Sequence, residues 1–337
     1  MGAHRDHVHP LLQGAATSPS AQAIARSLAS GERSVILLGN FAQQHPQAAQ
    51  IQILVQHIAE HSNAKFGFLG EAANSVGGYL AGALPGSNGL NAAAMLEQPR
   101  KAYLLLNVEA ELDTQNSQQA VAAMKAADMV VCMSAYKHQG AEYADVLLPI
   151  SPFTETSGTF VNTEGRAQSF KGAVKPLGET RPAWKVLRVL GNLLKVQGFD
   201  YDTSEAVRDA VLGGVNVASK LNNNLQDLVV QPAAAVSGLQ RVADVPIYAT
   251  DAIVRRSAPL QATHDAVTPC AAMHSEEMNK LGVKAGDQVK LSTAQGSAKL
   301  AVAADDKLPK GVVRVAAGHA ATAGLGAMFG TISVERV

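Results

Sequence analysis

The chain has 337 residues, of which 47% are hydrophobic and 17% are charged. At roughly 100–200 residues per domain, this length suggests two domains, each with its own core. The composition excludes a disordered chain, a coiled coil and a collagen-like protein. Lys and Arg together number 28, as do Asp and Glu, so the net charge gives no reason to expect nucleic acid or an anionic membrane as a partner.

The two cysteines, Cys132 and Cys270, lie far apart in the sequence. Without C-x-x-C spacing they cannot hold an iron–sulfur cluster or a zinc ion by thiolates alone. Cys132 falls in an apolar run, where a thiol is normally a buried, unreactive hydrophobe. The chain shows neither a signal-peptide pattern nor a run of about 20 apolar residues. We therefore expect a cytosolic protein in which residues 1–13 form a flexible terminus.

Apolar runs alternate with helical patterns between residues 20 and 149. Five runs predict strands, over 34–38, 64–69, 102–106, 129–133 and 144–149. Helices are expected between them, over 46–58 and 117–127. This alternation favours parallel pairing with right-handed crossovers. The expected fold class is therefore α/β, with an open, mostly parallel, Rossmann-like sheet covered by helices on both faces.

The pattern changes after residue 157. Alternating bulky and polar residues over 158–170 predict a hairpin or an extended loop. Thr180 is expected to cap a helix entered through Pro182, and Asp202 with Glu205 has the spacing of a capping box. These signals add two helices to the α/β part of the chain.

The C-terminal part has a different organisation. Residues 221–245 show little periodicity and are the best linker candidate. Ser275 is expected to cap a short helix that ends at Leu281-Gly282, followed by short strands over 288–292, 298–302, 312–315 and 331–334. So many short strands favour closure into a small β barrel. The predicted domains are thus an α/β domain over 14–220 and a barrel over 246–337.

Two places follow predicted strands and could carry chemistry. Gly39 ends the first strand, where an open α/β sheet receives a phosphate on a helix N-terminus. Because G-x-G-x-x-G spacing is absent, an ordinary strand-to-helix turn is favoured. Glu109, Glu111 and Asp113 follow the third strand, where carboxylates could accept hydrogen bonds from a ribose or simply begin a solvated helix.

A polar segment after the last α/β strand holds a third candidate. Glu155, Glu164 and Arg166 could form an acid, base and cation set. A loop-stabilising ion pair is the favoured alternative, because Gly158 and Gly165 suggest a segment whose backbone path matters most. Neither a Ser–His–Asp arrangement nor an H-E-x-x-H motif supports a hydrolase or a metalloprotease.

Longer motifs carry a family resemblance. The run A-D-V-L-L-P over 144–149, followed by F-T-E-T-S-G-T-F-V-N-T-E-G-R-A-Q over 153–168, closely resembles the molybdopterin oxidoreductase superfamily. Three further segments, 74–77, 95–103 and 178–185, are similar to the G subunits of NADH-quinone oxidoreductase, respiratory complex I. Residues 281–287 with Gly296 resemble the superfamily's C-terminal dinucleotide-binding domain, a double-psi β barrel. The resemblance extends over nearly everything from residue 14 onward.

The resemblance implies a C-terminal part of a longer subunit. Its relatives hold [2Fe–2S] and [4Fe–4S] clusters through cysteines of an N-terminal portion, so no cofactor is expected in this chain. The implied partners are other peripheral-arm subunits of complex I, with no nucleic acid and no direct membrane insertion. The implied location is cytoplasmic, peripheral to the inner (plasma) membrane through that complex.

Active superfamily members bind a molybdenum or tungsten pterin dinucleotide beside a G-x-N-P-like turn. Here that turn reads N-V-E-A-E over 107–111. Glu109 and Glu111 would place negative charge near a pyrophosphate, which costs affinity. We therefore expect a vestigial pterin site and a scaffold role, without catalytic residues or metal ligands in this chain. The candidate cofactor contacts are Gly39, Asn107, Glu109, Asn162, Gly165 and Arg166.

Two alternatives remain open from the sequence. One is an active pterin-dependent oxidoreductase similar to formate dehydrogenase, in which this chain supplies much of the cofactor cavity. The other is a nucleotide-binding α/β protein that takes NADH or a related nucleotide in the crevice beyond Gly39 and Glu109. Bound metal and pterin would indicate the first, and nucleotide binding in calorimetry would indicate the second.

Overall fold

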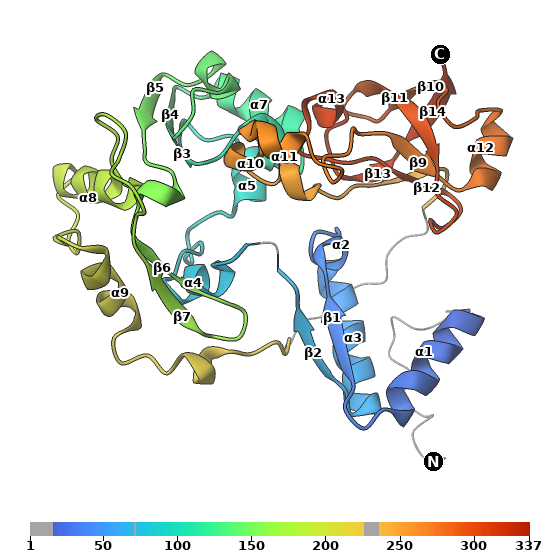
Figure 1. Cartoon of the computed structure of the whole chain (residues 1–337), viewed down its shortest axis with the longest axis horizontal. Helices are drawn as coiled ribbons and strands as arrows, with labels where there is room; N and C mark the ends of the chain where they lie inside the picture. The colour runs from blue at the N-terminus through green and yellow to red at the C-terminus, as the bar shows by residue number, and fades with distance from the viewer. Residues whose placement is uncertain (1–15, 71, 226–235) are drawn as a thin grey trace. The chain divides into compact units, whose positions relative to one another are not determined.

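The computed structural model describes residues 16–70, 72–225 and 236–337 (Figure 1). Contacts divide the chain into two compact units, each described here by itself. The first unit comprises Met1–Gly77, Val161–Ala167 and Gly214–Val236, and the second Gly78–Phe160, Gln168–Gly213 and Ser237–Val337. The predicted flexible terminus over 1–13 and residues 226–235 of the predicted linker lie outside the described residues.

A small parallel sheet and one long helix make the centre of the first unit. β1 (Val35–Leu38) pairs in parallel with β2 (Lys65–Phe68), as the apolar runs predict. The connecting helix α3 (Ala48–Ser62) buries Val55 and Ala59. The shorter helices of this unit are α1 (Pro19–Ser30), α2 (Asn40–Gln43) and η4 (Val217–Lys220).

The second unit contains a three-stranded parallel sheet, visible in Figure 1 as neighbouring arrows. Its strands, in the order β3-β4-β5, are β3 (Ala102–Leu106), β4 (Met129–Ser134) and β5 (Val146–Pro149). The helices around it are α5 (Ala92–Glu97), α6 (Ala110–Asp113), α7 (Ser117–Ala126) and the short η2 (Gln139–Glu142). Tyr103, Val130 and Cys132 on the strands pack with Ala120 and Met124 of α7 in one buried cluster. The predicted α/β class with parallel strands is confirmed.

The opposite face of this sheet is open. Leu104 is 46% exposed and Leu106 is 41% exposed, whereas Tyr103, on the other face of β3, is buried. Met129 and Val146 of the neighbouring strands are also exposed, at 49% and 39%. The predicted parallel strands are found as β1 with β2 in the first unit and as β3, β4 and β5 in the second, where the sheet has an exposed apolar face. Periodicity shows which residues are apolar, but not which layer covers them.

The remaining α/β elements are α4 (Ser75–Leu80), η3 (Phe153–Glu155), β6 (Gly158–Val161), β7 (Ala167–Phe170), α8 (Ala183–Leu193) and α9 (Ser204–Leu212). β6 and β7 form a two-stranded sheet, which confirms the predicted hairpin. The helix caps differ from the predictions by one or two residues. Pro182, not Thr180, is the N-cap of α8. Thr203, not Asp202, caps α9, and its Oγ1 accepts a hydrogen bond from the Ala206 N–H at 3.1 Å.

The C-terminal part of the second unit is a curled sheet of seven strands, a double-psi β barrel (Figure 1). The order is β13-β8-β12-β9-β11-β10-β14, and it mixes parallel with antiparallel pairs. The strands are β8 (Gln240–Val242), β9 (Ala271–Met273), β10 (Gln288–Ser292), β11 (Ser297–Ala304), β12 (Val312–Arg314), β13 (Phe329–Thr331) and β14 (Ser333–Arg336). The helices are η5 (Ile247–Ala249), α10 (Ala252–Arg256), α11 (Ala258–Gln261), α12 (Ser275–Leu281) and α13 (Ala320–Ala323).

The barrel confirms the predicted class but contains more strands than the sequence indicates. β8 and β9 have only three residues each, too few for an alternating pattern to show. β8 lies within the segment predicted as a linker. The strand predicted over 331–334 is divided at buried Ile332 into β13 and β14. The predicted helix is present as α12, which begins one residue earlier than predicted because His274 rather than Ser275 is its N-cap.

Candidate functional site

The loop that leaves β3 forms the centre of the candidate site. Asn107 adopts a left-handed φ of 53°, and its N–H donates to the Met133 carbonyl at 2.9 Å. Asparagine tolerates this conformation better than most residues. The backbone N–H of Glu109 then donates to Asp113 Oδ2 at 2.8 Å, so the loop is fixed by its own acidic side chain. The result is a rigid turn at the carboxyl end of a parallel strand, where ligands bind in open α/β sheets.

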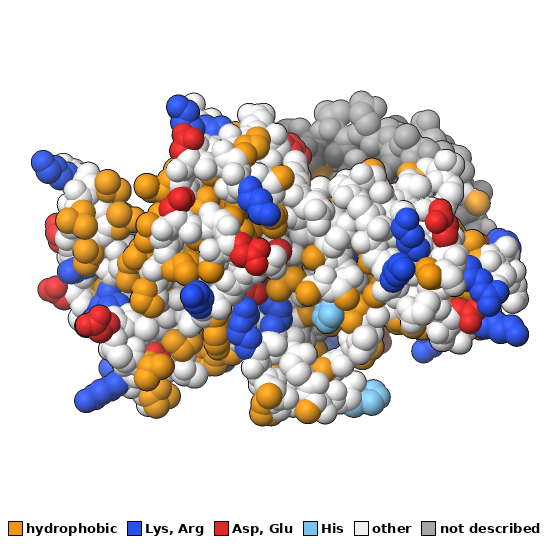
Figure 2. Space-filling model, turned by 90° about the horizontal axis from the view of Figure 1, so that it is seen from above, with side chains coloured by type: hydrophobic (Ala, Val, Ile, Leu, Met, Phe, Trp, Pro, Cys, Tyr) orange, Lys and Arg blue, Asp and Glu red, His pale blue; other side chains and the backbone are white. Residues whose placement is uncertain are grey.

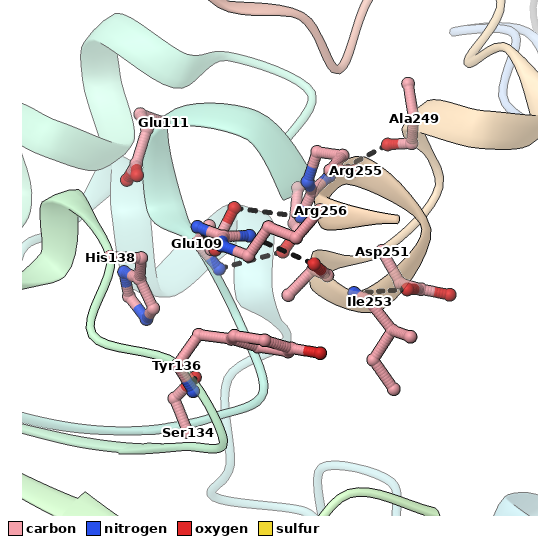
Figure 3. Close-up of polar contacts among 12 residues, drawn as sticks. Glu109, Glu111, Ser134, Tyr136, His138, Ala249, Asp251, Ile253, Arg255 and Arg256 are labelled. Carbon is pink, nitrogen blue, oxygen red and sulfur yellow. Dashed lines mark hydrogen bonds and ion pairs between the residues drawn. The ribbon is translucent and has the colours of Figure 1, made fainter. Parts of the chain in front are cut away.

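Glu109 points into the protein rather than into solvent. Its side chain is 1% exposed and lies between two arginines of α10 (Figure 3). The carboxylate is 2.6 Å from Arg256 Nη2 and 3.2 Å from Arg255 Nη2. Neither carboxylate oxygen receives a hydrogen bond of good geometry, so the attraction is mainly that of opposite charges in a desolvated space.

Other residues hold the two arginines in place. Arg255 also reaches Asp113 Oδ1 at 2.7 Å and the Ala249 carbonyl at 2.8 Å. The Arg256 guanidinium lies 5.1 Å from the centre of the Tyr136 ring, within cation–π range. Asp251 caps α10 through two backbone N–H groups. The short helix that carries both cations is thereby fixed against the β3 loop.

A second acidic group lies beside this cluster. Glu111 is buried and accepts a hydrogen bond from the Tyr143 hydroxyl at 3.0 Å, while that hydroxyl accepts one from the Ala110 N–H at 3.2 Å. Burial, helped by the Glu111 charge, raises the pKa of Tyr143 well above its usual range and also raises the pKa of the Cys132 thiol. Both groups are therefore neutral at physiological pH, which agrees with a structural role for Cys132.

The geometry allows a test of whether a pterin dinucleotide fits this turn. A pyrophosphate needs cations and N–H donors that no other anion has taken. Here Glu109 and Asp113 already neutralise Arg255 and Arg256 at distances of 2.6–3.2 Å. A pyrophosphate in the same place would meet a buried carboxylate and would be repelled. As it is built, the turn does not fit the group.

The other predicted site residues have local roles. Asn162 Oδ1 accepts hydrogen bonds from the N–H groups of Glu164 and Arg166, and Gly165 has a φ of 81°, so these residues form the β6–β7 turn. Gly39 is the N-cap of the four-residue helix α2 and has no side chain with which to cap it. Of the six candidates, Asn107 and Glu109 share one loop and Asn162, Gly165 and Arg166 share one turn.

Glu155 does not join Glu164 and Arg166. Its Oε2 accepts a hydrogen bond from the Leu177 N–H at 3.0 Å, so Glu155 holds a loop through a backbone group and not through the ion pair that the sequence favours. Arg255 and Arg256 were missed in the sequence. In the sequence they are only an adjacent pair of cations four residues after an Asp that can cap a helix. Nothing in the spacing links them to Glu109, which lies 146 positions before Arg255.

Within the described ranges, no group of three or more His, Cys, Asp or Glu side chains could hold a metal ion. The described helices include none with the length and apolar character needed to cross a membrane. Both findings concern only residues 16–70, 72–225 and 236–337.

The fold and the loop after β3 define a two-part protein of the pterin-oxidoreductase class, an α/β part followed by a double-psi barrel. The chain belongs to the molybdopterin oxidoreductase family, whose model matches residues 12–193. A second model, the molydopterin dinucleotide binding domain, matches residues 248–331. These matches cover the sheet, the Glu109 loop and most of the barrel.

Individual relatives match over shorter stretches. A Staphylococcus aureus protein whose name assigns it to the formate dehydrogenases is 43% identical over 81 residues, 24% of this chain and 8% of its own length. The mitochondrial 78 kDa subunit of NADH-ubiquinone oxidoreductase from Candida albicans is 48% identical over 69 residues, 20% of this chain and 9% of its own length. Acetylene hydratase from Pelobacter acetylenicus has a similar fold, with a TM-score of 0.53 at 17% identity over 72% of this chain and 46% of that one.

Proposed function

We propose that this chain is part of the G subunit of proton-pumping NADH-quinone oxidoreductase. In this role it is a structural scaffold of the peripheral arm, held at the cytoplasmic face of the membrane by its partner subunits. Its pterin site is vestigial, and the iron–sulfur clusters that carry electrons from NADH toward quinone belong to other parts of the assembly. The 48% identity to the Candida albicans 78 kDa subunit over 69 residues supports this assignment.

The observation that carries the proposal is the Glu109 clamp, defined as Glu109 with Arg255, Arg256 and Asp113. It lies in the turn beside which the family resemblance places the pterin dinucleotide of active members. The clamp neutralises both arginines from within the chain, at 2.6 and 3.2 Å from Glu109. A chain that has the family fold but fills the anion site with its own carboxylate is suited to a structural role rather than to catalysis.

The surface supports a scaffold role as well. Leu104, Leu106 and Met129 form an exposed apolar face on the β3–β5 sheet. Leu193 and Leu194 at the end of α8 are 75% and 66% exposed. Figure 2 shows hydrophobic side chains gathered on the left of the view, the side on which Figure 1 places α8 and β5. Apolar surface of this extent is typical of a protein that is covered by partners.

The first test is a cofactor analysis of the purified chain. Molybdenum and tungsten are measured by elemental analysis, and pterin by the fluorescence of its oxidised form after denaturation, with circular dichroism to verify the fold. We expect neither metal nor pterin. Stoichiometric metal with pterin would overturn the vestigial site and favour the formate-dehydrogenase-like alternative.

The second test concerns assembly. The tagged chain, expressed in its own cells, should migrate with an NADH-oxidising complex in a native gel. Leu104→Asp, on the open sheet face, should reduce this association, whereas the control Val267→Asp, at a residue that is 64% exposed in another part of the unit, should not. Migration of the folded wild-type chain as a free monomer would contradict the scaffold role.

A further inference from the structure

The barrel contains a cavity that the proposed scaffold role does not use. Its volume is about 500 Å³, within the range of roughly 300–1,000 Å³ typical of small-molecule sites. Every lining residue belongs to the barrel and none to the β3 loop: Arg241, Ser292, Thr293, Ala294, Gln295, Ala327, Phe329, Gly330, Thr331 and Ser333. The polar lining consists of hydroxyls, one amide and one cation, with no carboxylate.

Arg241 is the unusual member of this set. It is 2% exposed and ranks among the largest fully buried side chains of the described residues. Its Nη1 donates to the Gly326 and Ala327 carbonyls at 3.0 and 2.7 Å. These bonds hold the side chain in place but leave its charge uncompensated, because no described carboxylate lies within ion-pair distance of the guanidinium. A buried charge is normally paired.

The unused edge of the guanidinium has a defined shape. Nε is buried without a hydrogen-bond partner, and Nη2 makes no hydrogen bond within the described part of the chain. Nε–H and one Nη2–H point in parallel from one edge of the planar group, which matches two oxygens of a carboxylate or a phosphate. Desolvation by burial lowers the pKa of Arg241 to about 10, which a bound counter-charge would oppose.

The β strands bring the hydroxyls to this charge. Arg241 on β8 lies opposite Gly330 on β13, and Ser292 on β10 lies opposite Ser333 on β14. Glycine at position 330, with a φ of 138°, leaves open space beside the strand where a side chain would otherwise stand. Ser292, Thr331 and Ser333 thus supply hydrogen-bond donors to the cavity that Arg241 also lines.

We propose that this cavity binds the oxyanion group of a small molecule, with the Nε–Nη2 edge of Arg241 as its bidentate anchor and the barrel hydroxyls as further donors. A phosphate ester and a carboxylic acid are the two sources of such a group. Inorganic phosphate and acetate are the probes that separate them. The site is independent of the Glu109 clamp, so it can be present or absent whatever the outcome of the cofactor analysis.

The experiment titrates sodium phosphate, and separately sodium acetate, into the purified full chain at constant ionic strength set with sodium chloride. Binding is followed by isothermal calorimetry and by thermal unfolding. We expect saturable binding of at least one of the two anions. Arg241→Gln should weaken it by about tenfold or more, as the loss of a charge-assisted bidentate pair does. Lys290→Gln, which removes an exposed cation of the same barrel, should leave it unchanged.

Arg241→Gln also removes two bonds to carbonyls and can fail to fold. Ser333→Asp avoids this problem, because it keeps Arg241 and its carbonyl contacts but supplies a carboxylate in the cavity lining. It should abolish anion binding without lowering the melting temperature in anion-free buffer. Equal affinity in folded Arg241→Gln or in Ser333→Asp, or no saturable binding of either anion to the wild-type chain, would overturn the proposal.

Discussion

Replacing Glu109 by Gln tests the clamp directly. The substitution keeps the shape of the side chain but removes a charge that is 1% exposed and lies 2.6 Å from Arg256 and 3.2 Å from Arg255. Loss of one partner of a buried ion pair typically costs 3–5 kcal/mol. Two features place this case at the lower end: Arg255 keeps its bond to Asp113, and the Arg256 side chain is 34% exposed. We expect a loss of about 3 kcal/mol in the free energy of unfolding.

The assay is urea unfolding of the purified chain followed by far-ultraviolet circular dichroism at pH 7. Glu179→Gln is the matched control, because Glu179 is exposed and belongs to the same unit; it should change stability by less than about 0.5 kcal/mol. A double-mutant cycle with Arg256→Gln should show a coupling of about 1–3 kcal/mol. If Glu109→Gln is no more destabilising than the control, or if the coupling is zero, the clamp does not stabilise this fold and the reasoning fails.

Three further outcomes are expected. Gly296→Ala should lose about 1–3 kcal/mol in urea unfolding, because its Cβ would collide with the Gly324 carbonyl oxygen. Gly39→Ala, with open space at that position, should be close to neutral, and equal losses of stability in the two variants would contradict this packing. Tyr143→Phe should lose about 1–3 kcal/mol at pH 7 by leaving Glu111 without its donor. The pKa of Tyr143 is higher in the folded protein than in the unfolded chain. The stability that Tyr143 contributes is therefore complete below its unfolded pKa of about 10 and falls as the pH rises further. Tyr143→Phe should flatten the plot of stability against pH above about pH 10, and an unchanged plot would contradict the raised pKa.

The predictions from sequence succeed where a pattern is local and repeated. The run over 102–106 predicts β3 with its bounds as found, and the hairpin over 158–170 is present as β6 and β7. The shortest strands cannot be predicted from the sequence, for a physical reason. β8 and β9 have three residues each, and their stability comes from neighbouring strands in the barrel rather than from their own sequence. Caps are displaced by one or two positions: at α9 the adjacent Asp202 and Thr203 are both good cap residues and Thr203 is the one used, whereas α8 begins after Pro182 without any side-chain cap bond.

The candidate site shows the same division. Glu109 can be identified from the sequence because it follows an apolar strand. That it would repel an anion follows from its negative charge alone. Its burial and its partners are not identifiable, because Arg255 and Arg256 reach it through the packing of α10 on a loop 146 positions earlier. Arg241 carries even less signal, since a single Arg in a three-residue strand looks like an ordinary exposed cation until the barrel closes around it.

The two arginine environments of the second unit differ in one respect that decides what each can bind. Arg255 and Arg256 have carboxylates of the same chain within 3.2 Å, so an external anion would have to displace a partner that is covalently tethered and already desolvated. Such a partner has a high effective concentration and has lost little entropy on pairing. Among the described residues Arg241 has only carbonyl acceptors, which orient the guanidinium without neutralising it. An anion that enters its cavity has no tethered competitor. The tethered carboxylates that close the first site to a pyrophosphate have no counterpart beside Arg241 among the described residues, and this difference makes the second site favourable for an oxyanion.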